Sequence, residues 1–302
     1  YEGHLTVASG AEVTFGDEKL APTNPAWIAT APSHSVVWYD PNRQDVTKYI
    51  NGSATEPNHI LSETKNLADR QWYPLVGDAR GPYWRDAAYG FGPTNRWFDY
   101  AQALTKNGSV SRFVDTSADG YTFGTRTGFM VVESSSGGTL FLDTTISRDK
   151  TRLVVNRGIT NPIFVTRPGA EAAFVTNSPA FLNGYPVKSG EHRFNDRAEL
   201  LSFKFSDTFP VRCFGDYVQG GNNQTSLRHG EIIFTSEVLS ETQRKDTEAY
   251  LMKKWLGVLP EGYGDPSKVI VSGAGVVKLP ALVARPQFAN AFTGTAILKE
   301  AV

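Results

Sequence analysis

Apolar and polar residues alternate in short segments along most of the chain. Alternation with a period of two is typical of β-strands that bury one face. The first such segment spans residues 4–16, where the apolar positions are Leu5, Val7, Ala11, Val13 and Phe15. A Ser9-Gly10 pair interrupts it, and such a pair is typical of a turn. Residues 4–16 therefore predict two short strands joined by a turn.

Further strand-like segments follow at short intervals, and long helical patterns are absent between them. The segments predicted as strands are 36–40, 121–133, 138–145, 152–155, 162–166, 172–175, 200–205, 211–214 and 232–234. Many short strands separated by turn residues favour an all-β sandwich over an α/β architecture. The Asn183-Gly184 pair predicts a hairpin turn in the middle of this region.

The apolar pattern changes once, directly after the predicted strand 232–234. Ser240 and Gln243 have the spacing of a capping box, in which each side chain caps the other residue's backbone N–H. Gly257 suits the residue that follows a helix. The apolar positions that fall on one side of such a helix are Leu239, Tyr250, Leu251 and Trp255. The segment predicts one short amphipathic helix from Ser240 to Gly257.

The charge of the chain is nearly balanced, with 30 Lys and Arg against 31 Asp and Glu and a formal net charge of −1. This balance gives no electrostatic reason to expect nucleic acid or an anionic membrane as a partner. No apolar run approaches the length of a bilayer span. The lone cysteine, Cys213, offers no disulfide framework and is expected to be a small buried residue. Because the chain begins with Tyr1, we expect a mature or excised product.

The strand and helix between residues 230 and 257 carry a recognisable signature. Its residues are Glu231, Ile232, Ile233, Leu239, Ser240, Arg244, Glu248, Tyr250, Leu251, Lys254 and Trp255. This pattern resembles the closing signature of the concanavalin A-like lectin/glucanase superfamily, especially its laminin-G-like bacterial branch. Weaker matches are the segments 36–40, 66–69 and 183–184. The resemblance implies a concanavalin A-like jelly-roll sandwich over residues 32–257, in an all-β protein with one short helix near its C-terminal end.

The two ends of the chain form separate segments around this region. Residues 1–31 are an N-terminal β segment and loop, 258–267 are a linker by composition, and 268–302 alternate again as a C-terminal β segment. Both ends resemble fragments of the repeats of autotransporter-like surface proteins and β-solenoids. The segments either pair with each other or continue into a neighbour, because a single rung cannot bury its own apolar face. Residues 1–16 and 268–302 are therefore the expected contacts with other copies or adjacent domains.

Candidate catalytic patterns are missing from the sequence. Glycoside hydrolases with the concanavalin A-like fold carry an E-x-D-x-x-E motif on one strand. In this chain Glu231 is the only carboxylate of the closing strand, and we expect it to be structural. No G-x-S-x-G motif accompanies the five histidines, and His192 and His229 are expected to be solvated loop residues. No phosphate-binding glycine motif is present. We therefore expect a non-catalytic protein, with a carbohydrate-active hydrolase or lyase as the alternative.

A region rich in aromatic residues, 72–100, is the candidate carbohydrate site. Aromatic rings beside Arg, Asp and Asn suit sugars, which have apolar C–H faces edged by hydroxyl groups. The candidate residues are Trp72, Tyr73, Tyr83, Trp84, Trp97, Arg85 and Asp86. The alternative is that these rings fill the core or anchor a loop over it, because aromatic side chains dominate core burial.

A calcium loop is the candidate metal site. Asp115, Ser117 and Asp119, followed by Gly120, match the first part of a calcium-binding loop, which places oxygen ligands at alternate positions. Arg126 stands where a bidentate glutamate completes that loop, so an ordinary turn is the competing interpretation. Calcium is therefore the one cofactor that the sequence suggests.

Together these patterns predict a secreted or cell-surface bacterial protein, or one repeat unit of a longer one. The expected role is structural or adhesive, with glycans as the candidate ligand. A homopolymeric filament subunit, joined end to end by β-strand addition, is a further alternative.

Overall fold

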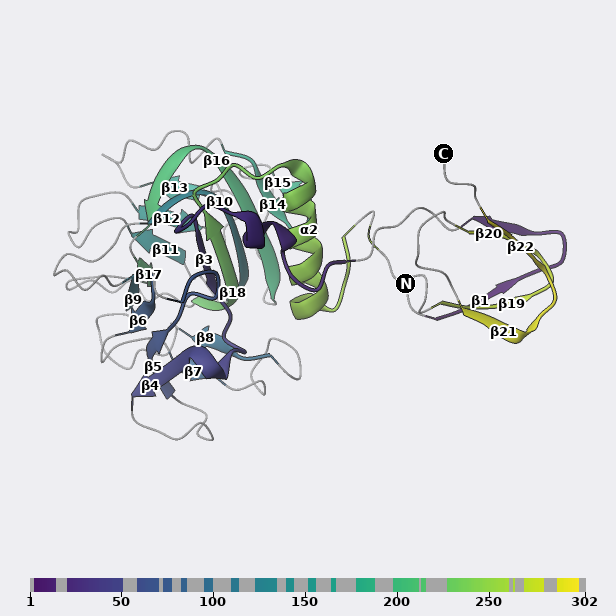
Figure 1. Cartoon of the computed structure of the whole chain (residues 1–302), viewed down its shortest axis with the longest axis horizontal. Helices are drawn as coiled ribbons and strands as arrows, with labels where there is room; N and C mark the ends of the chain where they lie inside the picture. The colour runs from purple at the N-terminus through teal and green to yellow at the C-terminus, as the bar shows by residue number, and fades with distance from the viewer. Residues whose placement is uncertain are drawn as a thin grey trace. The chain divides into compact units, whose positions relative to one another are not determined.

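A computed structural model gives the fold. It describes residues 3–14, 21–50, 59–70, 73–77, 83–85, 95–99, 110–113, 123–134, 140–143, 152–155, 164–166, 178–187, 198–211, 213–215, 227–260, 263, 269–279 and 287–298. The chain divides into two compact units, shown in Figure 1. Unit 1 combines Tyr1–Asn24 with Val258–Val302, and unit 2 is Pro25–Gly257.

The described residues of unit 1 form a stack of three rungs, each made of a strand, a turn and a second strand. Rung 1 contains β1 (Gly3–Val7) and β2 (Glu12–Thr14), rung 2 contains β19 (Val269–Gly273) and β20 (Val276–Leu279), and rung 3 contains β21 (Gln287–Phe292) and β22 (Thr295–Leu298). The first strands form the parallel sheet β1-β19-β21, and the second strands form the parallel sheet β2-β20-β22. The two ends of the chain thus pair with each other.

Close packing at the turns sets the register of this stack. Val7, Val271 and Val277 are buried between the sheets. The amides of Ala274 and Gly275 both donate to the carbonyl of Val7, at 3.0 and 3.1 Å. A Cβ atom on Gly275 would lie 2.4 Å from Cγ1 of Val7, so a residue without a side chain lets rung 2 approach rung 1.

The strands of unit 2 follow one hydrogen-bonded path, whose order is β13-β12-β11-β17-β9-β6-β5-β7-β8-β18-β10-β16-β14-β15, with β3 on β18 and β4 on β5. Their bounds are β3 Val36–Tyr39, β4 Thr47–Ile50, β5 His59–Thr64, β6 Leu75–Gly77, β7 Tyr83–Arg85, β8 Trp97–Asp99, β9 Val110–Phe113, β10 Phe123–Ser134, β11 Leu140–Asp143, β12 Arg152–Val155, β13 Phe164–Thr166, β14 Ala180–Leu182, β15 Tyr185–Val187, β16 Glu199–Val211, β17 Cys213–Gly215 and β18 Leu227–Thr235. The all-β class is confirmed. The predicted strand 172–175 lies outside the described residues.

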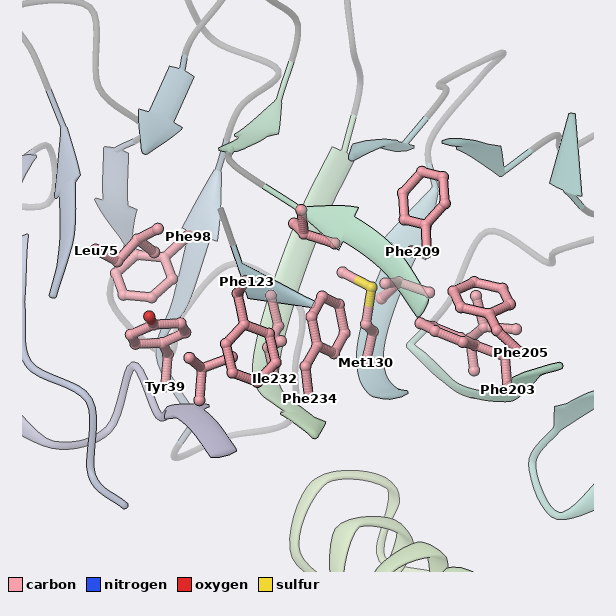
Figure 2. Close-up of a cluster of buried hydrophobic side chains, with 14 of the residues drawn as sticks. Tyr39, Leu75, Phe98, Phe123, Met130, Phe203, Phe205, Phe209, Ile232 and Phe234 are labelled. Carbon is pink, nitrogen blue, oxygen red and sulfur yellow. The ribbon is translucent and has the colours of Figure 1, made fainter. Parts of the chain in front are cut away.

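The central strands of unit 2 are buried on both faces. Alternate residues of β10 point to opposite sides, so Met130 belongs to one apolar cluster and Phe129 to another. The first cluster is rich in aromatic rings, and Figure 2 shows Phe203, Phe205 and Phe234 within it. The second cluster lies between this sheet and the helix α2 (Glu241–Leu251), as the helix beside β10 and β16 in Figure 1 indicates.

A short 3₁₀ helix, η1 (Ala26–Thr30), joins the cluster beneath α2. Trp27 is buried there, and its Nε1 donates to Oγ1 of Thr247 at 2.9 Å. Residues 25–31, which the sequence assigned to the N-terminal segment, therefore belong to unit 2. A second 3₁₀ turn, η2 (Gln44–Val46), precedes β4.

Two local predictions are confirmed by backbone geometry. Asn183 and Gly184 have φ values of 52° and 84° and form the turn of the β14–β15 hairpin. Ser240 caps α2 through the predicted capping box with Gln243, at 3.2 Å and 2.9 Å. The helix then changes to a π-helical turn, η4 (Met252–Leu256), and ends at Gly257 with φ 67°. The sequence did not indicate the π turn.

Replacing Ser240 with alanine is expected to lower the free energy of unfolding of unit 2 by about 1 kcal/mol, because the amide of Gln243 loses its acceptor. Ser240→Asp keeps an acceptor and should stay close to the wild type. All six tryptophans lie in unit 2, at positions 27, 38, 72, 84, 97 and 255, so tryptophan fluorescence during urea unfolding reports on unit 2 alone. Equal losses in the two variants would show that the cap contributes little.

Candidate functional site

The most concentrated polar contacts among the described residues surround Glu231 on β18. Its side chain is fully buried. The preceding residue, Gly230, makes room for the helix end, because a Cβ atom there would lie 2.7 Å from the ring of Trp255. The π turn η4 carries both Trp255 and Lys254, and both reach the carboxylate of Glu231.

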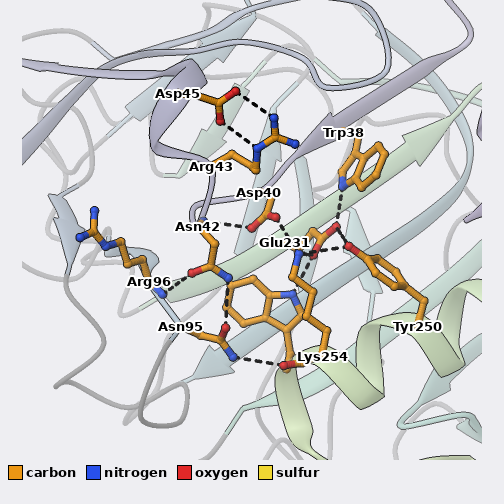
Figure 3. Close-up of polar contacts among 11 residues, drawn as sticks. Trp38, Asp40, Asn42, Arg43, Asp45, Asn95, Arg96, Glu231, Tyr250 and Lys254 are labelled. Carbon is orange, nitrogen blue, oxygen red and sulfur yellow. Dashed lines mark hydrogen bonds and ion pairs between the residues drawn. The ribbon is translucent and has the colours of Figure 1, made fainter. Parts of the chain in front are cut away.

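Four donors surround the two oxygens of this carboxylate, as Figure 3 shows in part. Oε1 accepts from Nε1 of Trp38 at 2.5 Å and from the hydroxyl of Tyr250 at 3.0 Å. Oε2 accepts from Nζ of Lys254 at 2.6 Å and from Nε1 of Trp255 at 2.8 Å. The donors come from β3, α2 and η4, so one side chain joins the sheet to both parts of the closing helix.

The network extends from Lys254 to the loop after β3. Nζ of Lys254 also donates to Oδ2 of Asp40 at 2.6 Å. Asp40 accepts from the backbone of Asn42 at 3.0 Å, and Asn42 in turn donates to Asn95 at 3.1 Å. Asn95 closes the circuit by donating to the carbonyl of Lys254 at 3.3 Å. Lys254 therefore holds two loops as well as the strand.

Burial and neighbouring charges set the protonation states. Burial raises the pKa of Glu231 and the charge of Asp40 acts in the same direction, whereas Lys254 and Trp255 lower it. Burial alone would lower the pKa of Lys254, but the charges of Glu231 and Asp40 outweigh it and raise that pKa. The net effect is a raised pKa for Glu231, even though four groups donate to its two oxygens.

A second buried carboxylate, Glu248 of α2, lies over the same sheet. It accepts hydrogen bonds from the hydroxyl of Ser202 and from the guanidinium of Arg244. Arg244 also pairs with Glu241 at 2.5 Å and stacks 3.6 Å above the ring of Phe181. Burial raises the pKa of Glu248, while Ser202 and Arg244 lower it. This cluster fixes the other end of the helix to β14 and β16.

These contacts explain why the signature residues occur together. Glu231, Tyr250, Lys254 and Trp255 form one network, and Arg244 and Glu248 form the other. Asn66, from a weaker match, accepts from the amide of Trp38 and donates to the carbonyl of Val36, and so holds β3 in place. Both oxygens of Glu231 and Oε1 of Glu248 accept hydrogen bonds from internal donors, so these two side chains join the helix to the sheet.

The residues predicted to bind carbohydrate differ in their burial and in how much of each the structure describes. Trp97 is fully buried in the cluster beneath α2, so the reading of this ring as an exposed platform is wrong. Tyr73 is half-buried, meets Phe123 edge-on at 5.3 Å and packs on the core. Tyr83, Trp84 and Arg85 form β7, and only their backbone is described. Trp72 and Asp86 lie outside the described residues.

The other predicted groups are placed as follows. Asp115, Ser117 and Asp119 lie outside the described residues, and no group of His, Cys, Asp and Glu side chains within the described part could hold a metal ion. His229 is fully buried in β18, which corrects its assignment to a solvated loop. The described helices include none that is long and apolar enough to cross a membrane.

Comparisons with known proteins give little guidance. No protein-family model matches the chain, and no curated protein matches it. A search of solved structures finds the Agl-KA catalytic domain, with a TM-score of 0.21 and 11% sequence identity, over 67% of this chain and 38% of that chain. The chain thus corresponds to well under half of that domain's length, and a likeness at this level assigns neither fold nor activity.

Proposed function

We propose that the chain is a non-catalytic surface protein in which a β-solenoid presents an inserted concanavalin A-like sandwich. The observation that carries this proposal is the order of the elements. Unit 2 enters the chain between rung 1 and rung 2, although these rungs are neighbours in the stack. Solenoids accept insertions between rungs because each rung contacts only its neighbours. A domain inserted there is displayed by a scaffold that remains intact.

A structural or adhesive role fits the chemistry of unit 2. Two of its buried carboxylates, Glu231 and Glu248, accept hydrogen bonds from internal donors, and their contacts join the helix to the sheet. A secreted or cell-surface location suits a scaffold of this kind, and the single cysteine is compatible with it. The proposed adhesive ligand is a glycan bound near β7, where Tyr83, Trp84 and Arg85 follow one another between β5 and β8.

A glycan array probed with the whole chain tests the adhesive part of this proposal. We expect binding to a restricted set of glycans and a loss of about tenfold or more in affinity for Trp84→Ala, because stacking on the ring is removed. Tyr185→Ala is the matched control, since Tyr185 is 61% exposed on a different hairpin and should leave binding unchanged.

Two outcomes would contradict this function. Binding at background level by the wild-type chain would exclude a glycan ligand from the array. Release of reducing or unsaturated sugar ends from polysaccharide mixtures would show an enzyme, and Glu231→Gln should then be compared with the wild type to identify the responsible group.

A further inference from the structure

The two ends of the rung stack carry strand edges that have a pairing partner on one side only, among the described residues. β1 and β2 pair with rung 2 alone, and β21 and β22 also pair with rung 2 alone. The outer side of rung 1 and the outer side of rung 3 therefore each present backbone donors and acceptors of parallel strands.

Hydrogen bonds within the stack show which backbone groups point outward. The amide of Thr295 donates to the carbonyl of Gly275 at 3.2 Å, and the amide of Val276 donates to the carbonyl of Ala11 at 2.9 Å. Backbone groups alternate in direction along a strand, so the N–H of Ala296 and the N–H of Glu12 point away from rung 2. Both residues are exposed.

These edges lack the features with which natural sheets discourage pairing. In natural sheets, edge strands that resist further pairing commonly carry lysine, proline or inward-pointing charges. The outer strands of unit 1 read GHLTV, EVT, QFANAF and TAIL, with Glu12 as their single charged residue and no proline. By contrast β15, the last strand on the sheet path of unit 2, contains the exposed Pro186. The edges of unit 1 are therefore suited to further pairing.

We propose that rung 3 of one copy of this chain pairs with rung 1 of a second copy, as parallel strands in a head-to-tail contact. Rung 1 already stacks on a rung of this kind, since β1 and β2 both pair in parallel with rung 2. Rungs 1 and 3 have the same plan, a longer strand of five or six residues followed by a shorter one of three or four. The inference concerns unit 1 and does not depend on glycan binding by unit 2.

Apolar burial favours this contact. Val7, Val271 and Val277 form the buried cluster described within the stack, so a longer stack buries more apolar surface per rung. A head-to-tail contact leaves one unpaired edge at each end of a dimer, so we expect dimers first and longer chains of copies as the concentration rises.

Analytical ultracentrifugation of the whole chain over a wide range of concentrations tests the contact. The wild type should associate reversibly, as dimers first and as longer head-to-tail assemblies at higher concentration. Ala296→Pro and Glu12→Pro each remove an outward N–H without removing a bond to rung 2, and each should raise the dimer dissociation constant by about tenfold or more. Ala296→Val and Glu12→Gln keep the N–H and should behave like the wild type; Glu12→Gln also controls for the ion pair with Lys278 at 2.7 Å.

Mixing the two proline variants decides the direction of the contact. Ala296→Pro leaves the rung 1 edge intact and Glu12→Pro leaves the rung 3 edge intact, so the mixture should recover a one-to-one dimer. Hydrogen exchange of the unmodified chain should also slow at residues 12–14 and 295–298 as concentration rises. A monomer at every concentration, exchange that does not depend on concentration, or a dimer of one proline variant alone would each overturn the proposal.

Discussion

Glu231→Ala is expected to lower the free energy of unfolding of unit 2 by about 3–5 kcal/mol, the usual cost of breaking a buried ion pair by removing one partner. The substitution removes the acceptor of four donors at once, among them the two indole N–H groups of Trp38 and Trp255. It also leaves the ammonium of Lys254, which is largely buried, with Asp40 as its remaining carboxylate partner. A buried donor without an acceptor costs the full desolvation of that group.

Urea unfolding followed by tryptophan fluorescence measures this loss, because all six tryptophans lie in unit 2. Glu237→Ala is the matched control, since Glu237 is an exposed carboxylate six positions further along the chain, and its removal should change stability by no more than about 0.5 kcal/mol. A loss below about 1 kcal/mol for Glu231→Ala would show that the network adds little to stability.

A double-mutant cycle separates the ion pair from the other contacts. Lys254→Met alone leaves Glu231 as a buried carboxylate that has lost its cation. The double variant, which combines Glu231→Ala with Lys254→Met, removes both charges of the pair. The two losses should therefore be less than additive, by about 1 kcal/mol or more. Additive losses would place the stabilising effect in the indole and hydroxyl donors rather than in the charge pair.

Local features of this chain could be predicted because neighbouring residues determine them. The capping box of Ser240 and Gln243, the end at Gly257 and the turn at Asn183-Gly184 each depend on a few consecutive residues. The Glu231 network could not be predicted in this way, because its residues are distant in the sequence. Its contact with Trp38 joins positions 193 residues apart, and no periodic pattern relates them. The π turn that brings Lys254 and Trp255 to the carboxylate also arises from this packing.

The burial of the aromatic residues in region 72–100 also could not be predicted from the sequence pattern. Its irregular spacing gives no period by which a buried ring could be told from an exposed one, and Trp97 proves to be core. The terminal segments behave similarly. Alternation predicts that residues 4–16 form strands, but it does not name their partner. The pairing of β1 with β19 joins the two ends of the chain, and only the fold selects it from the two alternatives.

His229 should make unit 2 lose stability as the pH falls below neutrality. Burial lowers the pKa of this imidazole to about 4, and the bond to the carbonyl of Gly230 offsets this only in part. An unfolded histidine has a pKa near 6.5, so the unfolded chain binds the proton first. The stability contributed by the neutral ring is complete above pH 6.5 and is lost between pH 6.5 and pH 4. At pH 4.5 the loss from this group should be about 2.5 kcal/mol.

His229→Asn isolates this term, because the amide nitrogen of asparagine can replace Nδ1 as the donor to Gly230 but does not titrate. Removing most of the ring, which packs on Phe98 at 5.3 Å, should destabilise unit 2 at neutral pH by a constant amount. The difference in unfolding free energy between the two proteins should therefore shrink as the pH falls, while the titration of all other groups cancels. A difference that stays constant from pH 8 to about pH 4.5 would mean that His229 is protonated as readily in the folded chain as in the unfolded one. Such a result would be inconsistent with a fully buried ring that packs beside Phe98.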